Sequence, residues 1–182
     1  MAKPAGVIRL KAAPDARAAY AEWRRWLADE RRASAHTLEA YGRDLAAFFE
    51  FLADHLGGPP GLDDLAGLKA ADFRAWLARR AGQGLRRSSM ARGLSVVRGF
   101  FRYLDRSGRV HNAAINTVRF PKPPKPVPKA LSVSDAAEAV KAVGALSRRP
   151  WLGKRDIALF LLLYGAGLRI GEALALNRGD VP

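Results

Sequence analysis

The stretch "SSMARGLSVVRGFFRYL" at residues 88–104 decides the fold, because its apolar residues repeat with the period of an α-helix. The apolar positions stand three or four residues apart along the chain. They are Leu94, Val97, Phe101 and Leu104. We predict a helix that opens at Ser88 or Ser89, reaches Asp105 and turns this face inward.

The opposite face of the same helix is basic. From Arg86 to Arg109 the sequence holds seven arginines and one acid, Asp105. Basic and small residues form one stripe, which consists of Arg92, Ser95, Gly99, Arg102 and Arg106. A solvated face is the simpler interpretation. The near absence of acids and a second basic segment close by favour contact with DNA, which small residues would allow to approach closely.

Other residues of this region are candidates for DNA contact. At the start of the helix, unpaired N–H groups and the helix dipole attract phosphate. The candidates there and along the helix are Arg87, Ser88, Ser89, Arg92, Ser95, Arg98 and Arg102.

Helical spacing extends to both sides of this stretch. It predicts helices over residues 14–28, 34–55 and 69–80, and a short one near Asn112, after a disordered lead of residues 1–13. Residues 14–116 are therefore predicted to form one all-α domain. At the start of the second helix, Ser34, His36, Thr37 and Arg43 either cap and pack or touch DNA backbone, and the two interpretations stay open.

A basic, proline-rich segment follows at residues 117–130. The run "RFPKPPKPVPKAL" (119–131) has five prolines, four basic residues and no acid, which predicts an extended connector. An ordinary linker is one interpretation. A strap along phosphates would also explain Lys122, Lys125 and Lys129.

A second helical unit is expected over residues 131–182. Residues 132–143 have the pattern of a helix capped by Ser132 or Ser134, and residues 150–167 that of an apolar helix ended by glycines. Residues 169–176 begin another helix. These helices are apolar on several sides, so we expect the second domain to be incomplete at Pro182.

The composition agrees with a nucleic-acid partner. Of 182 residues, 31 are basic and 17 acidic, a net charge of +14, although a GC-rich genome would also enrich arginine. The absence of cysteine excludes thiolate metal sites, and three scattered histidines have no metal-ligand spacing. With neither a long apolar run nor a signal peptide, we expect a cytoplasmic protein without a membrane partner.

Four segments together resemble the tyrosine recombinases, most closely the bacterial Xer type. They are "SAHTLEAYGRDLAAFFEFL" (34–52), "SSMARGLSVVRGFFRYL" (88–104), "PKPPKPVPKALS" (121–132) and "RDIALFLLLYGAGLRIGEALAL" (155–176). The resemblance implies a SAM-like helical core-binding domain, then the first helices of a mixed α+β catalytic domain. It also implies site-specific recombination of double-stranded DNA through a 3′-phosphotyrosyl intermediate.

Further expectations follow from this resemblance. Arg169 matches the family's first catalytic arginine, and Glu172 would support it. The family's lysine, histidine, further arginine and nucleophilic tyrosine are expected beyond Pro182, so this chain alone should be inactive. Other expectations are a tetramer at the nucleoid, with or without a second Xer-type recombinase, a role in resolving chromosome dimers, and no cofactor. The alternatives are a DNA-binding module without catalysis and a phage or mobile-element integrase.

Overall fold

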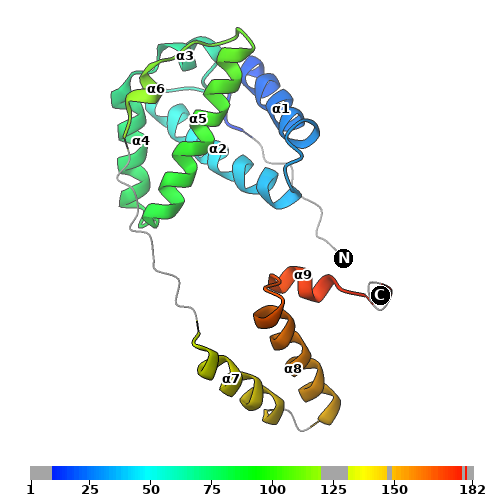
Figure 1. The fold of residues 1–182 in the computed structure, drawn as a ribbon. Helices are drawn as coiled ribbons and strands as arrows, with labels where there is room; N and C mark the ends of the chain where they lie inside the picture. Colours follow the sequence, from blue (N-terminus) through cyan, green and yellow to red (C-terminus); the bar gives the residue numbers. More distant parts are fainter. Residues whose placement is uncertain (1–9, 120–130, 147–148, 178, 180–182) are drawn as a thin grey trace. The chain divides into compact units, whose positions relative to one another are not determined.

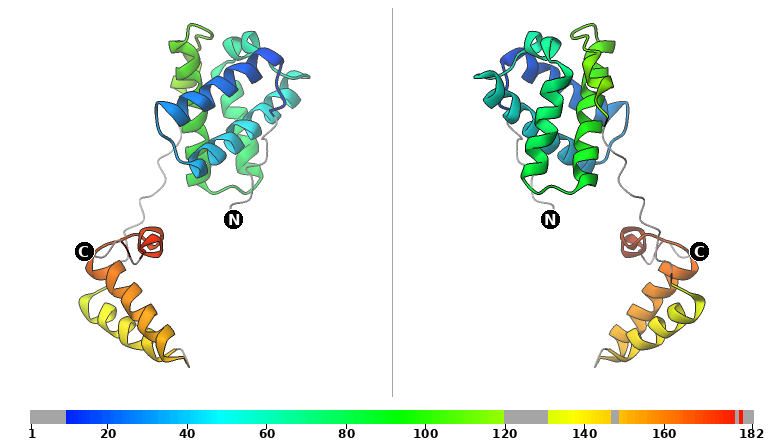
Figure 2. Two further views of the ribbon diagram at one scale, coloured as in Figure 1. Left: turned by 90° about the vertical axis from the view of Figure 1, so that its right-hand side faces the viewer. Right: turned by 90° about the vertical axis from the view of Figure 1, so that its left-hand side faces the viewer.

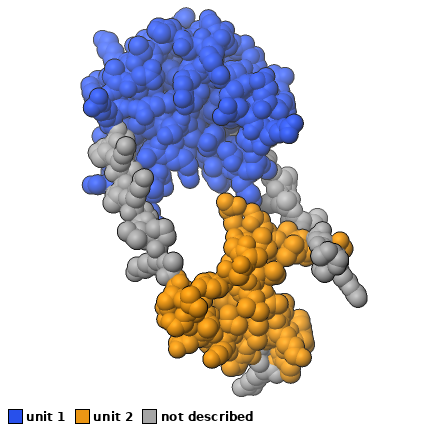
Figure 3. All heavy atoms as spheres, viewed as in Figure 1, with its two compact units in different colours: residues 1–124 blue, residues 125–182 orange. Residues whose placement is uncertain are grey.

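The computed structural model describes residues 10–119, 131–146, 149–177 and 179, and in these residues every regular element is a helix. The predicted all-α class is therefore confirmed for the described part of the chain. The chain divides into two compact units, residues 1–124 and 125–182, which Figure 3 colours separately. The division falls inside the segment predicted to be a linker, whose residues 120–130 lie outside the described ranges.

Unit 1 is a bundle organised around one long helix. In chain order its described helices are α1 (Pro14–Asp29), α2 (Ala35–Leu56), α3 (Leu62–Gly67), α4 (Ala70–Gly82), α5 (Arg87–Arg106) and α6 (Ala114–Thr117). Helix α5 contacts α1, α2, α4 and α6, and it crosses α2 in Figure 1. Figure 2 shows α4 and α5 side by side, joined by a short connection. These four contacts fix α5 within the bundle, so the backbone that carries the residues on its remaining face is also fixed.

Aromatic side chains fill the core of unit 1. Phe100 of α5 meets Trp23 of α1 edge-on, with ring centroids 5.4 Å apart, and Phe101 meets Phe73 of α4 at 5.5 Å. The predicted inward face of α5 is confirmed, since its four residues are at most 3% exposed. Phe100 and Val96 are also buried, which the predicted stripe omitted. The buried face is wider because α5 packs against α1 on one side and α4 on the other.

Carboxylates and a serine fix the helix starts in unit 1. Ser34 caps α2 as predicted, since its hydroxyl accepts a hydrogen bond from the Thr37 N–H at 3.2 Å. Helix α3 was not predicted. Its start is held by Asp64, which accepts from the Gly61 N–H at 2.8 Å, and Asp72 does the same for the Lys69 N–H at 2.7 Å before α4.

Asn112 links the start of α6 to the end of α3 and the residues that follow it. Its side-chain amide donates to the carbonyls of Leu65 and Leu68, both at 2.9 Å, and its oxygen accepts from the Ala114 N–H at 2.9 Å. The helix predicted near Asn112 is thus the four-residue α6, with Asn112 preceding it.

Residues 10–13 are packed, so the expectation of disorder across residues 1–13 is wrong for this part. Leu10 and Ala12 are buried, and the Ala13 N–H donates to the Pro60 carbonyl at 2.9 Å. The apolar side chains here extend the core beyond the first helix. Residues 1–9 lie outside the described ranges.

Unit 2 contains α7 (Val133–Ala145), α8 (Pro150–Gly165) and α9 (Ile170–Ala175) in its described residues. Of the two predicted capping serines, Ser132 is the N-cap of α7, with its hydroxyl accepting from the Asp135 N–H at 3.1 Å. Helices α7 and α8 meet at two glycines, because a Cβ on Gly153 would lie 2.7 Å from the Gly144 carbonyl oxygen. Many large apolar side chains stay exposed, including Trp151 at 60%.

Among the described residues, no helix combines the length and the apolar character needed to cross a bilayer.

The capping carboxylates predict how the stability of unit 1 depends on pH. The pKa of Asp15 is lowered chiefly by the hydrogen bond from the Leu62 N–H, and that of Asp72 chiefly by the one from the Lys69 N–H. The folded chain therefore binds protons at these groups less tightly than the unfolded chain does. We expect the free energy of unfolding to fall as the pH is lowered from about 5 to about 2, and Asp72→Asn to flatten that decline.

Urea denaturation at several pH values, followed by tryptophan fluorescence, measures this dependence, since Trp23, Trp26 and Trp76 all report on unit 1. Glu50→Gln serves as a control, because Glu50 is an exposed carboxylate of α2. A decline equally steep in wild type and Asp72→Asn would contradict the assignment.

Candidate nucleic-acid interface

A groove of about 510 Å³ lies on unit 1 along the face of α5 that is opposite the core. All five residues of the predicted stripe line it: Arg92, Ser95, Gly99, Arg102 and Arg106. Its other lining residues are Val96 and Asp105 of α5 and residues from α1, the turn that follows α1, and α2. The stripe inferred from helical spacing is therefore one continuous wall of a real depression.

Aromatic rings form part of the groove's lining. The Trp23 ring lies parallel to that of Tyr41 from α2, with centroids 6.2 Å apart. Gly99 lies next to this pair, and a Cβ at its position would be 3.9 Å from Trp23. Because Gly99 has no side chain, the α5 backbone stays accessible there. The groove is thus lined by both aromatic rings and guanidinium groups.

The α1 side of the groove carries two cations stacked on a tryptophan. The guanidinium carbon of Arg106 lies 4.9 Å from the Trp26 ring centroid, and that of Arg31 lies at 5.8 Å. The indole N–H of Trp26 donates to Glu30 at 2.7 Å. Helical spacing singled out neither Trp26 nor Arg31 as a groove residue. Arg31 and Arg106 are far apart in the sequence, and only the fold brings them to the same tryptophan in the groove.

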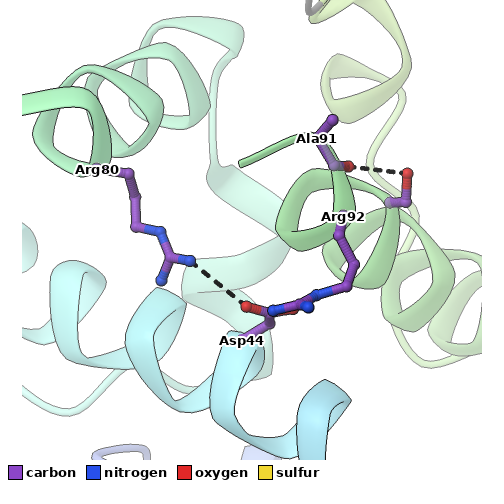
Figure 4. Close-up of polar contacts among 5 residues, drawn as sticks. Asp44, Arg80, Ala91 and Arg92 are labelled. Carbon is purple, nitrogen blue, oxygen red and sulfur yellow. Dashed lines mark hydrogen bonds and ion pairs between the residues drawn. The ribbon is translucent and has the colours of Figure 1, made fainter. Parts of the chain in front are cut away.

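Arg92 is held by a carboxylate that the sequence did not single out. Its Nε donates to Oδ2 of Asp44 at 2.9 Å, while Nη2 of Arg80 donates to Oδ1 at 3.4 Å (Figure 4). Asp44 is 3% exposed, whereas the Arg92 side chain is 54% exposed. The hydrogen bond to Asp44 raises the pKa of Arg92. The sequence does contain a sign that Asp44 has a buried partner, because this acid directly precedes Leu45 on the inner side of α2.

Arg98, which the sequence indicated as a candidate for DNA contact, does not line the groove. Its guanidinium donates to the carbonyls of Ile115 and Val118 at the end of α6. On the helix, Arg98 lies between the stripe and the buried face, where α6 packs against α5. It therefore satisfies carbonyls that α6 leaves without helical partners.

The remaining candidates on unit 1 lie outside this groove. Arg87 and Ser88 are exposed in the first turn of α5, next to half-buried Ser89, and Arg86 makes no side-chain capping bond there. His36 is exposed at the start of α2. Thr37 bonds to the Ser34 hydroxyl, and Arg43 pairs with Glu39 at 2.9 Å. Lys122, Lys125 and Lys129 lie outside the described ranges.

In unit 2, Glu172 holds Arg169 in the predicted contact. Glu172 accepts from the Arg169 backbone N–H at 2.8 Å and from its Nη1 at 2.9 Å. The backbone bond is the main cause that lowers the pKa of Glu172. The turn before Arg169 depends on Gly167, whose φ is 66°, whereas Gly165 ends α8 without a positive φ.

The Arg169 guanidinium is exposed in this structure. The side chain is 87% exposed, and that of Glu172 is 51% exposed. The reason is that α9 has only six residues and buries only Ala173 in the described part of unit 2. The guanidinium is thus oriented by Glu172 but surrounded by solvent.

Known proteins resemble this chain over the part that contains the groove. Residues 21–108 match the family model described as "Phage integrase, N-terminal SAM-like domain", and these residues include both sides of the groove. A tyrosine recombinase XerC of Rhodospirillum centenum is 52% identical over 169 residues, which cover 93% of this chain and 50% of that protein.

Two further relatives have the same name. The tyrosine recombinase XerC of Mesorhizobium japonicum is 44% identical over 94% of this chain and 55% of its own length. That of Rhizobium meliloti is 47% identical over 88% of this chain and 51% of its own length. The chain spans about half the length of the curated relatives it matches. With a SAM-like domain at residues 21–108 and this identity along nearly all of its length, the chain belongs to the tyrosine recombinase family.

Proposed function

We propose that the groove of unit 1 binds double-stranded DNA and that the protein acts in site-specific recombination of the Xer type. The observation that carries this proposal is the single groove wall formed by three arginines with Ser95 and Gly99 between them. Guanidinium groups bind phosphate and base edges, and the small residues let a duplex approach the helix backbone. The names of the relatives favour this function over a mobile-element integrase.

The chemistry would be cleavage and rejoining of DNA through a 3′-phosphotyrosyl intermediate, which conserves the phosphodiester bond energy without metal or nucleotide. Attack on the phosphate gathers negative charge on its non-bridging oxygens. Arg169 would stabilise this charge with its planar pair of donors, while Glu172 fixes its position. These donors gain strength when DNA or protein displaces the surrounding water.

The assembly would be a tetramer of recombinase protomers on DNA at the nucleoid, in the cytoplasm, with or without a second Xer-type recombinase. Its task would be chromosome dimer resolution. The 182-residue chain by itself would bind DNA and leave strand transfer to a protein that also carries a nucleophilic tyrosine. Tyr20 and Tyr41 of unit 1 pack in or against its core, and so does Tyr103. A DNA-binding module without catalysis is the second candidate function.

A nicked suicide duplex tests the catalytic part of the proposal. We expect the 182-residue chain to shift the duplex in a native gel and to give no covalent protein–DNA adduct in a denaturing gel. The tyrosines of unit 1 pack in or against its core, and exposed Tyr164 of α8 is not where the family resemblance places the nucleophile. Covalent adduct formation would contradict the proposal, and absence of any gel shift at low salt would contradict DNA binding.

Replacing Arg102 tests the groove. Arg102→Ala should lower the affinity for a labelled duplex about tenfold at low salt, because one guanidinium contact is lost. It should also make the slope of log K against log salt shallower by about 1. Fluorescence anisotropy across a salt series measures both quantities.

Arg74→Ala is the matched control, since Arg74 is an exposed arginine of α4 that does not line the groove and the change removes the same charge. We expect it to change the affinity less than about twofold. Equal losses in both variants would mean that DNA senses only net charge and would argue against the groove.

Gly99→Ala separates stability from DNA binding. The new methyl group would meet Trp23 at 3.9 Å, an ordinary contact, and alanine favours a helix over glycine. We expect the free energy of unfolding to rise by up to about 1 kcal/mol. The affinity for DNA should fall, because the methyl group occupies the groove where the backbone is accessible.

Urea denaturation and anisotropy measure the two effects of Gly99→Ala. Gly82→Ala is the control, because Gly82 lies in α4 with no atom within 4 Å of an added Cβ. A Gly99→Ala variant that binds DNA as tightly as wild type would show that no close approach occurs at this position.

A further inference from the structure

Asp44 is a buried charged residue. It accepts a hydrogen bond from Arg92, and Arg92 lines the groove. Asp44 and Arg80 are the only charged residues buried in the described part of the chain. Asp44 comes from α2, Arg80 from α4 and Arg92 from α5, and Figure 4 shows the carboxylate between the two guanidinium groups. Asp44 does not line the groove, so it cannot contact a ligand there directly.

The pairing of Asp44 with Arg80 does not by itself explain why Asp44 is buried. Their hydrogen bond is long, at 3.4 Å, and Nε of Arg80 has no hydrogen-bond partner in the described residues. Arg80 also lies over the Trp76 ring, with its guanidinium carbon 5.8 Å from the centroid. An isolated buried ion pair is often no more stable than apolar residues of the same volume. The shorter bond, 2.9 Å, goes to the half-exposed Arg92.

The bond to Asp44 determines which part of Arg92 stays available. Asp44 takes the Nε–H of Arg92, and neither terminal nitrogen has a hydrogen-bond partner in the described parts of the chain. These terminal nitrogens are the donors that can bind a phosphate or the acceptors of a guanine. The bond at Nε favours the rotamer of Arg92 that lines the groove.

We propose that Asp44 is a positioning residue for DNA binding, which orients the Arg92 guanidinium in the groove before the duplex arrives. This inference rests on the proposed function of the groove. A side chain oriented in advance loses less conformational freedom on binding, which raises the affinity. Arg80 supports the arrangement from the far side by donating to the other oxygen of the Asp44 carboxylate.

The sign of one substitution distinguishes positioning from simple charge. Asp44→Asn keeps the volume of the side chain and removes a negative charge close to the groove, so the net charge rises from +14 to +15. Electrostatic attraction alone would then strengthen DNA binding and steepen its salt dependence. Positioning predicts the opposite, an affinity about tenfold lower, because the amide holds Arg92 less firmly.

The experiment measures anisotropy of a labelled duplex with the full 182-residue chain. In the Arg92→Ala background, Asp44→Asn should no longer lower the affinity, since the residue that it positions is absent. Unchanged or tighter binding by folded Asp44→Asn would overturn the proposal. Urea denaturation of the same samples shows whether each variant is folded.

Arg92→Lys gives a test that does not depend on the folding of an Asp44 variant. Lysine keeps the charge of Arg92, whose side chain is half-exposed, but it has no Nε–H for Asp44 and no planar pair of donors. We expect Arg92→Lys to lose about as much affinity as Arg92→Ala, whereas Arg102→Lys keeps most of it, because no carboxylate in the described residues holds Arg102 through Nε. Wild-type affinity in Arg92→Lys would overturn the proposal.

Failure of the positioning role and failure of the groove function give different results. If Arg102→Ala weakens binding while Arg92→Lys and Asp44→Asn do not, the groove binds DNA and only the role of Asp44 is wrong. If neither Arg102→Ala nor Arg92→Ala changes the affinity, the groove itself is not the DNA site.

Discussion

The packing of Phe100 and Phe101 into rings from three other helices is the interaction on which unit 1 depends. Phe100 contacts Trp23 of α1 and Phe49 of α2, and Phe101 contacts Phe73 of α4. These contacts fix the rotation of α5 about its own axis. Once that rotation is fixed, the residues on the opposite side of the helix can only face the groove. The basic surface is thus a geometric consequence of the aromatic core.

The buried Asp44 and its two arginine partners add orientation to this packing. The aromatic contacts set the rotation of α5 but leave the long arginine side chains free to choose among many rotamers. Asp44 limits that choice for Arg92, and it does so from α2, which the core holds against α5. Arg106 is limited differently, by stacking on Trp26. The groove therefore contains cations whose positions are set by the fold and not by the ligand.

Features that depend on a single helix could be predicted from the sequence, and features that depend on two could not. The inward face of α5, the cap of α2 by Ser34 and the contact of Glu172 with Arg169 all join residues three or four positions apart. The partners of Arg92 and Arg98 lie 48 and 17 or more residues away, so helical spacing could not find them. Helix α3 was missed because six residues are too short for a periodic pattern.

The exposure of Arg169 shows the same distinction in energetic terms. The sequence predicted its partner but not its dielectric surroundings, and the strength of a phosphate contact depends on both. Next to Arg169, Ile170 and Leu174 of α9 are 62% and 68% exposed. A surface that covers these apolar side chains would remove water from Arg169 in the same step. Burial of α9 and strengthening of the Arg169 contact with phosphate would then be one event, driven by the hydrophobic effect.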